Sequence, residues 1–172
     1  MAADELRILG FKYELFIYNK ATGKLVDYDV QYNRIPQAGI DYLIQAPFGD
    51  VAPISNWYCG MFRNNFLPDA STTSADIPSA MGEFVDYSEA TRPLWARGYN
   101  GLGTMDNAGT RAVFTPTADR LLYGAFIASN PTKGGSTGLL LSVVRFSTAK
   151  QVYRGEEAKL VCGITYIPTN VI

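Results

Sequence analysis

The sequence lacks the residues on which most catalytic sites depend. None of its 172 residues is a histidine, and only two are cysteines. Without histidine, the commonest general base near neutral pH is absent, and Ser-His-Asp, Cys-His and imidazole metal sites are excluded. The carboxylates form no cluster along the chain. These absences predict a binding or structural protein that is not an enzyme and uses no cofactor or metal ion.

Long apolar runs and an excess of one charge are also missing. No window of about 18 apolar residues occurs, so we expect no membrane-spanning helix and no membrane partner. The first ten residues contain neither a cationic stretch nor an apolar one, and we expect no secretion signal. Lys and Arg number 15 against 16 Asp and Glu, without blocks. This balance predicts no direct binding to nucleic acid.

Apolar residues are abundant enough for one well-filled core. They make up 47% of the chain, which includes eleven Tyr and nine Phe. We expect a single domain over residues 10–172, preceded by an N-terminal arm at residues 1–9. Cys59 and Cys162 each lie in an apolar run, which favours two buried free thiols over a disulfide.

Alternating apolar residues predict strands along most of the chain. Tyr13, Leu15 and Ile17 alternate within a hairpin predicted over residues 10–31, and Gly23 suits a left-handed position in its turn. Further short strands are predicted at residues 55–62, 83–87, 93–97, 110–115, 120–129, 138–146 and 158–167. This spacing without intervening helices predicts a mostly β fold, either an antiparallel β-sandwich or a jelly-roll-like barrel.

One short helix is predicted near residues 36–46. Ile40, Leu43 and Ile44 are spaced by three and four, and Pro47 and Gly49 are expected to end the helix. Residues 63–82 are rich in Asn, Pro, Asp, Ser, Thr and Ala and predict a long surface loop. Residues 100–109 and 130–138 are glycine-rich and are expected to form exposed loops at the ends of the sheets.

Several local patterns resemble functional sites but favour structural roles. Asp86 and Glu89 could act as an acid/base pair, yet such residues more often form a solvated turn. In the run that begins with Lys133, the lysine precedes the glycines, whereas a phosphate loop requires Gly-Lys-Ser/Thr before a helix. Asp69 and Asp76 are spaced too widely for a calcium loop. Each pattern therefore predicts a turn or loop.

The aromatic residues are expected in the core. At alternating strand spacing, a buried position is favoured over a carbohydrate-binding or ligand-binding groove. The residues concerned are Trp57, Tyr58, Phe62, Phe84, Tyr87 and Trp95.

An ordered series of motifs resembles a family of small virion proteins of tailed bacteriophages. The most specific are Trp57-Tyr58-Cys59-Gly60, Arg92-Pro93-Leu94-Trp95 and Lys133-Gly134-Gly135. They occur in order with further segments at residues 33–36, 38–43, 83–87, 123–129 and 155–161, and so cover most of the chain. The resemblance implies a structural component of the virion, with no catalytic or metal motif to carry over.

Within that family, we expect a capsid decoration or cement protein. Such a protein sits on the capsid exterior, binds the major capsid protein and itself forms a homo-oligomer there; it is made in the host cytoplasm. The residues predicted to contact partners come from the arm, the start of the long loop and a glycine-rich loop. They are Leu6, Arg7, Ile8 and Leu9, then Arg63, Asn64, Asn65 and Phe66, and Lys133.

Three alternatives remain open from the sequence. The runner-up is a globular neck, tail or collar protein of the same virion, whereas a long fibre would show repeats or heptads. A glycan hydrolase would need Glu83, Asp86 or Glu89 to face a groove lined by Trp57 and Trp95. A glycan-binding sandwich would need those tryptophans to be exposed.

Overall fold

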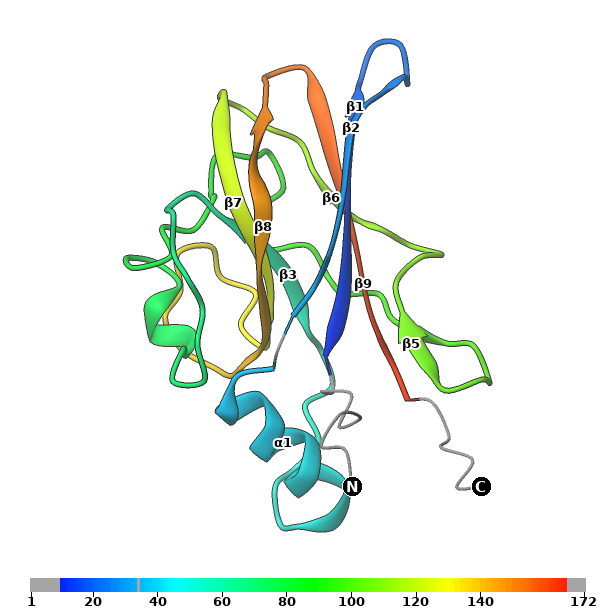
Figure 1. Ribbon diagram of the computed structural model, residues 1–172, viewed down its shortest axis with the longest axis vertical. Helices are drawn as coiled ribbons and strands as arrows, with labels where there is room; N and C mark the ends of the chain where they lie inside the picture. Colours follow the sequence, from blue (N-terminus) through cyan, green and yellow to red (C-terminus); the bar gives the residue numbers. More distant parts are fainter. Residues whose placement is uncertain (1–9, 34, 167–172) are drawn as a thin grey trace, which may run out of the picture.

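The protein is a two-sheet antiparallel β-sandwich with one short α-helix. The computed structural model describes residues 10–33 and 35–166. Sheet A has the strand order β2-β1-β9-β5-β4, with β6 also paired to β9, and sheet B has the order β3-β7-β8 (Figure 1). The predicted fold class, a mostly β antiparallel sandwich, is confirmed. Among the described residues, neither helical segment is long and apolar enough to cross a membrane.

The elements follow one another in this order. They are β1 (Phe11–Asn19), β2 (Leu25–Tyr32), α1 (Gln37–Phe48), β3 (Tyr58–Phe62), the 3-10 turn η1 (Ser74–Asp76), β4 (Gly98–Tyr99), β5 (Thr104–Asp106), β6 (Ala112–Phe114), β7 (Arg120–Ala128), β8 (Leu140–Val152) and β9 (Glu156–Thr165).

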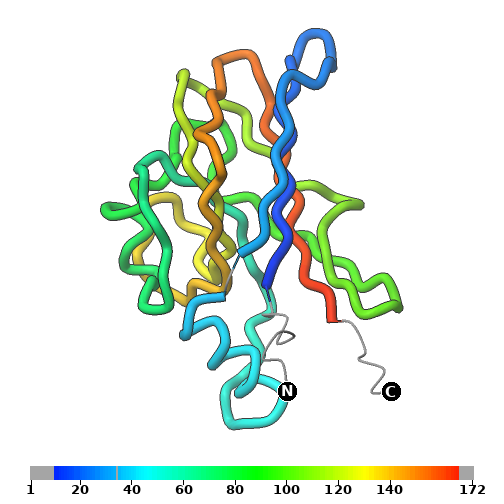
Figure 2. Tube along the Cα trace, viewed as in Figure 1, coloured from blue at the N-terminus to red at the C-terminus, as the bar shows by residue number. Residues whose placement is uncertain are grey.

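The predicted N-terminal hairpin is confirmed as β1 and β2. Tyr13, Leu15 and Ile17 are buried on the inner face of sheet A, as their alternation predicts. Gly23 occupies its turn with a φ of 68°, a left-handed conformation that favours glycine. On its other side β1 pairs with β9 along its whole length, so two strands far apart in sequence lie side by side at the centre of sheet A (Figure 2).

Sheet B is buried on both faces. Its inner face packs into the main core between the sheets, and its outer face carries Phe62, Phe126 and Leu140 in a second apolar cluster. Ile77 and Met81, from the segment at residues 63–82, complete that cluster and are fully buried. Burial on both faces explains why β7 and the first half of β8 are almost continuously apolar. The long loop is thus a third layer over sheet B.

Two glycines allow phenylalanine rings to lie flat on the outer face of sheet B. Gly60 stands opposite Phe126 across the β3–β7 pair, and Gly124 stands opposite Phe62. A β-carbon added at Gly60 would lie 2.1 Å from the Phe126 ring, and one at Gly124 would lie 2.2 Å from the Phe62 ring. Each ring therefore fills the space that a side chain would otherwise need.

A buried ion pair fastens the glycine-rich loop at residues 130–138. Arg92 Nε and Nη2 each lie 2.7 Å from a carboxylate oxygen of Glu83, and both side chains are almost fully buried. Arg92 also donates to the carbonyls of Asn130 and Gly135, while the Gly134 N–H donates to Glu83. The predicted loop is confirmed, and this bidentate pair ties it to the segment that carries residues 83 and 92.

Several predicted strands are corrected by the structure. Residues 83–87 and 93–97 form only isolated bridges, because Phe84, Tyr87 and Trp95 pack into the core without extending a ladder. Residues 100–109 are not a simple exposed loop, since β5 pairs with β9 inside this segment. Asn107 holds the segment there, because its side chain accepts from the Cys162 N–H at 2.7 Å and donates to the Leu160 carbonyl at 3.1 Å, both on β9.

Other predicted boundaries are off by a few residues. β3 begins at Tyr58 rather than residue 55, and β8 continues to Val152 rather than ending at 146. The helix passes through Pro47 and ends at Phe48, and it is capped by Gly49, whose N–H donates to the Gln45 carbonyl. Because Pro47 lies in the last turn, it removes only one internal hydrogen bond of the helix.

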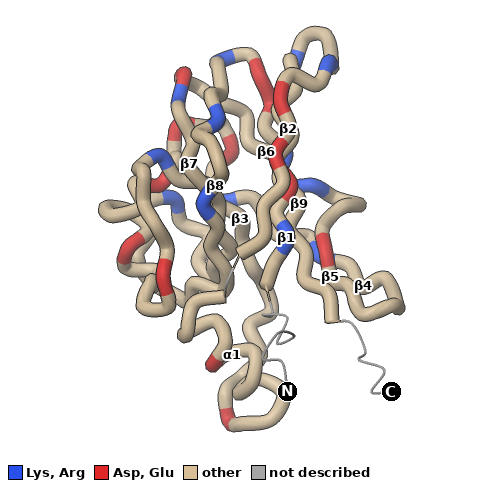
Figure 3. Tube along the Cα trace, in the orientation of Figure 1, with Lys and Arg blue, Asp and Glu red and all other residues tan. Residues whose placement is uncertain are grey.

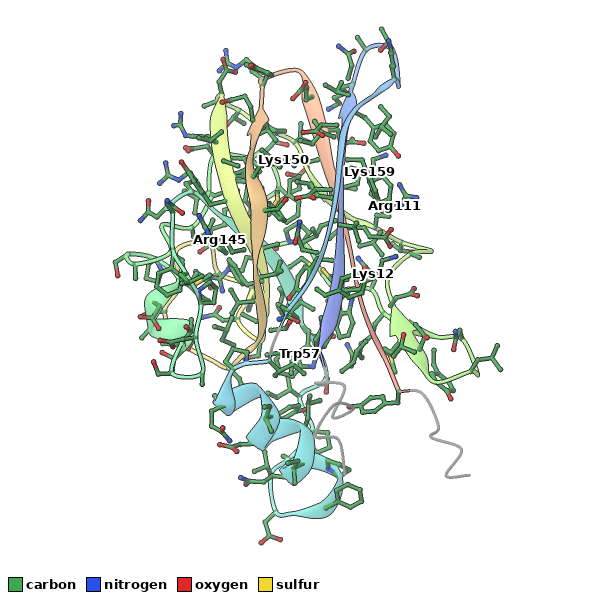
Figure 4. All side chains as sticks on the ribbon, in the orientation of Figure 1. Lys12, Trp57, Arg111, Arg145, Lys150 and Lys159 are labelled. Carbon is green, nitrogen blue, oxygen red and sulfur yellow. The ribbon has the colours of Figure 1, made fainter. Side chains whose placement is uncertain are left out.

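The predictions for cysteine and tryptophan are confirmed. Cys59 and Cys162 are free and buried, and burial together with the neighbouring Cys59 thiol raises the pKa of Cys162 well above its ordinary value. Trp57 and Trp95 belong to the main core, and Figure 4 shows Trp57 where the sheets meet α1. Tyr42 of α1 packs edge-on against Trp57, with the ring centroids 5.2 Å apart.

The edge strand β2 is inverted relative to the usual pattern of a sandwich. Asp27 and Asp29 share the inward side with Ile17 and Leu15 of β1, while Tyr28 and Val30 point away from the core. Lys150 of β8, which is labelled in Figure 4, reaches across from sheet B, and its Nζ lies 3.2 Å from a carboxylate oxygen of Asp27. Polar residues thus face inward on β2 and apolar residues face outward.

A carboxylate on this outer side gives a pH-dependent prediction. Partial burial raises the pKa of Glu14, but hydrogen bonds from Tyr28 and Lys12 outweigh burial, so the pKa is lowered overall. The resulting stabilisation is present above the unfolded-state pKa and is lost as the pH falls through the folded-state pKa. Tyr28→Phe should raise the pKa of Glu14 and reduce this loss of stability in acid.

An NMR titration of the Glu14 side-chain carboxyl carbon measures this shift. Tyr32→Phe is the matched control, because among the described residues the Tyr32 hydroxyl has no recorded hydrogen bond. Equal Glu14 pKa values in Tyr28→Phe and in the wild type would contradict the assignment.

Candidate interaction surface

Two of the predicted contact residues are held by internal bonds. Arg63 Nε donates to the Glu83 carbonyl at 3.3 Å, and its Nη1 lies 3.7 Å from Asp86. The Asn64 amide donates to the carbonyls of residues 79 and 80, which closes the base of the long loop. These two side chains therefore shape the loop from within.

The next two predicted residues lie beside a pocket. Asn65 accepts a hydrogen bond from Arg145 of β8, and Phe66 packs edge-on against Phe62 with the ring centroids 6.5 Å apart. Arg145 lines the pocket, as does Leu67, the residue that follows Phe66. The structure thus brings the end of the predicted 63–66 stretch to the pocket margin.

The other predicted contact residues are not brought to this place. Lys133 donates to the Tyr87 carbonyl at 2.7 Å, and its ammonium group lies 3.8 Å from the centroid of the Tyr87 ring. Its charge is thus engaged within the molecule. Leu6, Arg7, Ile8 and Leu9, predicted as an arm that adds a strand to a partner, lie outside the described residues.

The pocket has a volume of about 530 Å³ and lies between α1, the start of the long loop and β8. Apolar side chains line its interior, and they are Ile35, Ile40, Val143 and Val144. Tyr32 and Leu67 also line it, and each is 74% exposed. Asp69 and Arg145 add one charge of each sign. Such a lining suits an apolar group that carries a polar end.

Exposed apolar residues continue from the pocket along α1. Ile40 lines the pocket, and Ile44 and Phe48 follow at steps of four residues on the same side of the helix. Phe48 is 88% exposed and Ile44 is 57% exposed. Gly39 fixes the opposite side of the helix, because a β-carbon there would lie 2.3 Å from the Leu141 carbonyl. We call Tyr32, Leu67, Ile44 and Phe48 the helix-end surface.

The helix-end surface lies in an acidic part of the chain. Residues 37–56 contain Asp41 and Asp50 but no Lys or Arg. Elsewhere the two signs are interspersed, whereas the α1 end shows acidic positions only (Figure 3). Apolar and acidic groups together fit a partner that offers apolar and basic groups.

The carboxylates considered for catalysis do not line a tryptophan groove. Glu83 is bound by Arg92, Asp86 lies 2.6 Å from Arg120 Nε, and Glu89 accepts from the Thr115 N–H and hydroxyl. Both tryptophans are buried. Within residues 10–33 and 35–166, no three potential metal-binding His, Cys, Asp or Glu side chains gather.

Comparisons with known proteins add no identification. No protein-family model matches this chain, and no curated protein matches it significantly. The resemblance to phage virion proteins therefore stays a prediction from the sequence motifs.

Sequence reasoning missed the helix-end surface. It used Ile44, together with Ile40 and Leu43, only as evidence for a helix, and Ile44 is exposed. One signal was available: Ile44 and Phe48 are apolar in a segment that has no basic residue. The pocket itself had no sequence signal, because it is built from three segments that are far apart along the chain, at residues 32–40, 67–70 and 143–145.

Proposed function

We propose that this chain is a non-enzymatic structural protein of a tailed-bacteriophage virion, which binds the capsid exterior and stabilises contacts between major capsid subunits. The observation that carries the proposal is the helix-end surface, where Leu67 lines an apolar pocket and Phe48 is exposed on α1, two turns beyond Ile40 of the pocket. Exposed apolar groups that rim a pocket mark sites of protein contact. The protein is made in the host cytoplasm and resides on the virion.

The architecture suits a bridging role on a capsid. Two sheets, a third layer packed on sheet B, and a loop fastened by the buried Arg92–Glu83 pair give a rigid body, which loses little conformational freedom on binding. A rigid bridge that fits only the mature arrangement of subunits stabilises that arrangement by selective binding. Many copies on one shell make a modest affinity per copy sufficient.

The hydrogen bonds and ion pairs of the three candidate carboxylates support a non-enzymatic role. Glu83, Asp86 and Glu89 each hold a structural contact, which leaves none of the three free as an acid/base pair. The buried tryptophans also give no support to a glycan-binding groove. On the partner, we expect the matching site to combine apolar and basic side chains.

Cryo-electron microscopy of virions with and without this protein tests the proposal. We expect the virions that lack it to lose density on the capsid exterior and to rupture at a lower temperature. An unchanged shell with density missing at the neck, tail or collar would instead identify the alternative position in the virion. Intact density everywhere would refute a virion role.

A substitution on α1 tests the surface itself. Phe48→Asp should weaken binding to capsids that lack this protein by about thirtyfold. This is the effect expected from the loss of a hot-spot side chain that contributes about 2 kcal/mol. The measurement is a titration of purified variant onto capsids, with bound protein separated by sedimentation. Leu102→Asp is the matched control, because Leu102 is 82% exposed in the turn between β4 and β5, outside this surface. Equal affinities of the two variants would exclude the helix-end surface as the capsid contact.

A further inference from the structure

The outer face of sheet A is a second exposed surface, distinct from α1. Tyr28 and Val30 of β2 point outward beside Phe16 and Glu14 of β1, their register partners. We call this surface the sheet A outer face. Its residues are Tyr28 and Val30 on β2, Lys12, Glu14, Phe16 and Tyr18 on β1, and Glu157 and Lys159 on β9.

Aromatic rings and cations form a connected strip across this face. Phe16 lies 4.9 Å from Tyr28 and 6.4 Å from Tyr18, between ring centroids. Arg111 lies over Phe16 at 4.3 Å, and Lys159 lies over Tyr18 at 5.2 Å. In Figure 4 Lys12, Arg111 and Lys159 lie on the side of sheet A away from β7 and β8. Tyrosine and arginine are enriched in protein interfaces, so the composition fits a contact surface.

The free edge of β2 is poorly suited to the addition of a strand. The Tyr28 N–H donates to the Asp27 carboxylate at 2.7 Å, and the Val30 N–H donates to Asp29 at 2.9 Å. Two donors that an added strand would use are therefore occupied, and inward-facing carboxylates on an edge strand oppose pairing. A partner would contact the outer face rather than the edge.

The charges of this face are balanced and locally paired. Lys12 lies 3.1 Å from Glu14 on β1, and Lys159 lies 2.7 Å from Glu157 on β9. A partner of a single charge sign would meet repulsion as well as attraction here. A second copy of the same face carries both signs, and the net charge of −1 creates little repulsion between two chains. The face is therefore complementary in charge to itself.

We propose that two copies of this chain form a two-fold dimer by packing their sheet A outer faces together. Each copy contributes the same residues, as a closed two-fold contact requires. The two sheets stack face to face, so the apolar groups of Tyr28, Val30 and Phe16 leave water. This inference does not depend on the capsid role: only Tyr32 of the helix-end surface is on β2, at its end beside Lys12, and Ile44, Phe48 and Leu67 lie outside sheet A.

Analytical ultracentrifugation of the full chain over a range of micromolar concentrations tests the dimer. We expect the wild type to approach twice its 18.9 kDa mass as the concentration rises. Val30→Lys should raise the dimer dissociation constant by about thirtyfold or more. Leu121→Lys is the matched control, because Leu121 is 39% exposed on a sheet B strand and Val30 is 36% exposed on a sheet A strand. A wild type that stays monomeric, or a dimer that both variants leave intact, would overturn the proposal.

Lysine acetylation of the wild type locates the contact in a second way. It needs no substituted protein, so a variant that fails to fold cannot affect the result. Lys12 and Lys159 should react more slowly in concentrated than in dilute protein, because the dimer covers them. Lys20 and Lys24, exposed at the β1–β2 turn, should react at the same rate in both samples. A dimer in which Lys12 and Lys159 keep their dilute rates would place the contact elsewhere and overturn the proposal.

Discussion

Arg92→Leu is expected to lower the free energy of unfolding by about 3–5 kcal/mol, because it leaves a buried carboxylate without its partner. Glu83 would then keep one hydrogen bond from the Gly134 N–H in place of three, and the carbonyls of Asn130 and Gly135 would lose their donor. Urea unfolding followed by tryptophan fluorescence measures the change, since both tryptophans are in the main core.

Arg120→Leu is the matched control for this experiment. Arg120 Nε lies 2.6 Å from Asp86, as close as the buried pair, but both side chains are about one-third exposed. Water already solvates these charges, so the expected loss is below about 1 kcal/mol. Similar losses in the two arginine variants would mean that burial of the Arg92 pair does not determine its contribution.

Gly124→Ala is expected to lower the free energy of unfolding by about 3 kcal/mol, near the upper end for an overpacked core. The added methyl group would lie 2.1 Å from the Val144 carbonyl and 2.2 Å from the Phe62 ring. The carbonyl belongs to the β7–β8 ladder, and the ring is fully buried, so neither can move without disturbing sheet B. Thermal unfolding by circular dichroism measures the loss.

Gly98→Ala provides the comparison within a strand of sheet A. A β-carbon at Gly98 meets nothing within 4 Å, and its φ is not positive. We expect this substitution to be neutral or to stabilise by a few tenths of a kcal/mol, because alanine restricts the unfolded chain. A Gly124→Ala protein as stable as Gly98→Ala would disprove the close packing of the two Gly–Phe pairs.

The sequence predicted the strands and the helix in which apolar residues recur at a regular spacing. The alternation of Tyr13, Leu15 and Ile17 predicted both the existence of β1 and its buried side. The spacing of Ile40 and Leu43 predicted α1 to within two residues at its C-terminal end. In these segments the local preference and the tertiary packing agree.

Residues 83–87 failed as a predicted strand for a physical reason. Their aromatic content is typical of strands, but Glu83 turns its carboxylate inward to Arg92 and Phe84 fills the main core. The strand propensity of a residue largely reflects how well its side chain packs on a half-buried surface. Residues 83–87 pack in this way without pairing along a neighbouring strand. Nothing local to the chain revealed that Arg92 would be their partner, nine residues away.

The candidate surfaces were harder to predict than the fold. The alternation in β2 fixes which residues share a side, but it does not say that Tyr28 and Val30 are the outward ones. The register with β1 decides that orientation, because it sets Asp27 beside the buried Ile17, and Lys150, 123 residues away, then meets Asp27 on the inward side. The pocket beside α1 likewise depends on long-range packing, so sequence alone located only its margin at residues 65 and 66.

The pairing of β1 with β9 has a consequence for how the protein is made. During translation, the β1–β2 hairpin leaves the ribosome long before β9 has been synthesised, and a two-stranded hairpin alone is marginally stable. The edge of β1 that pairs with β9 therefore stays unpaired until nearly the whole chain has been synthesised. Chains that stop before residue 156 cannot complete sheet A, and unfinished products are expected to be degraded rather than assembled.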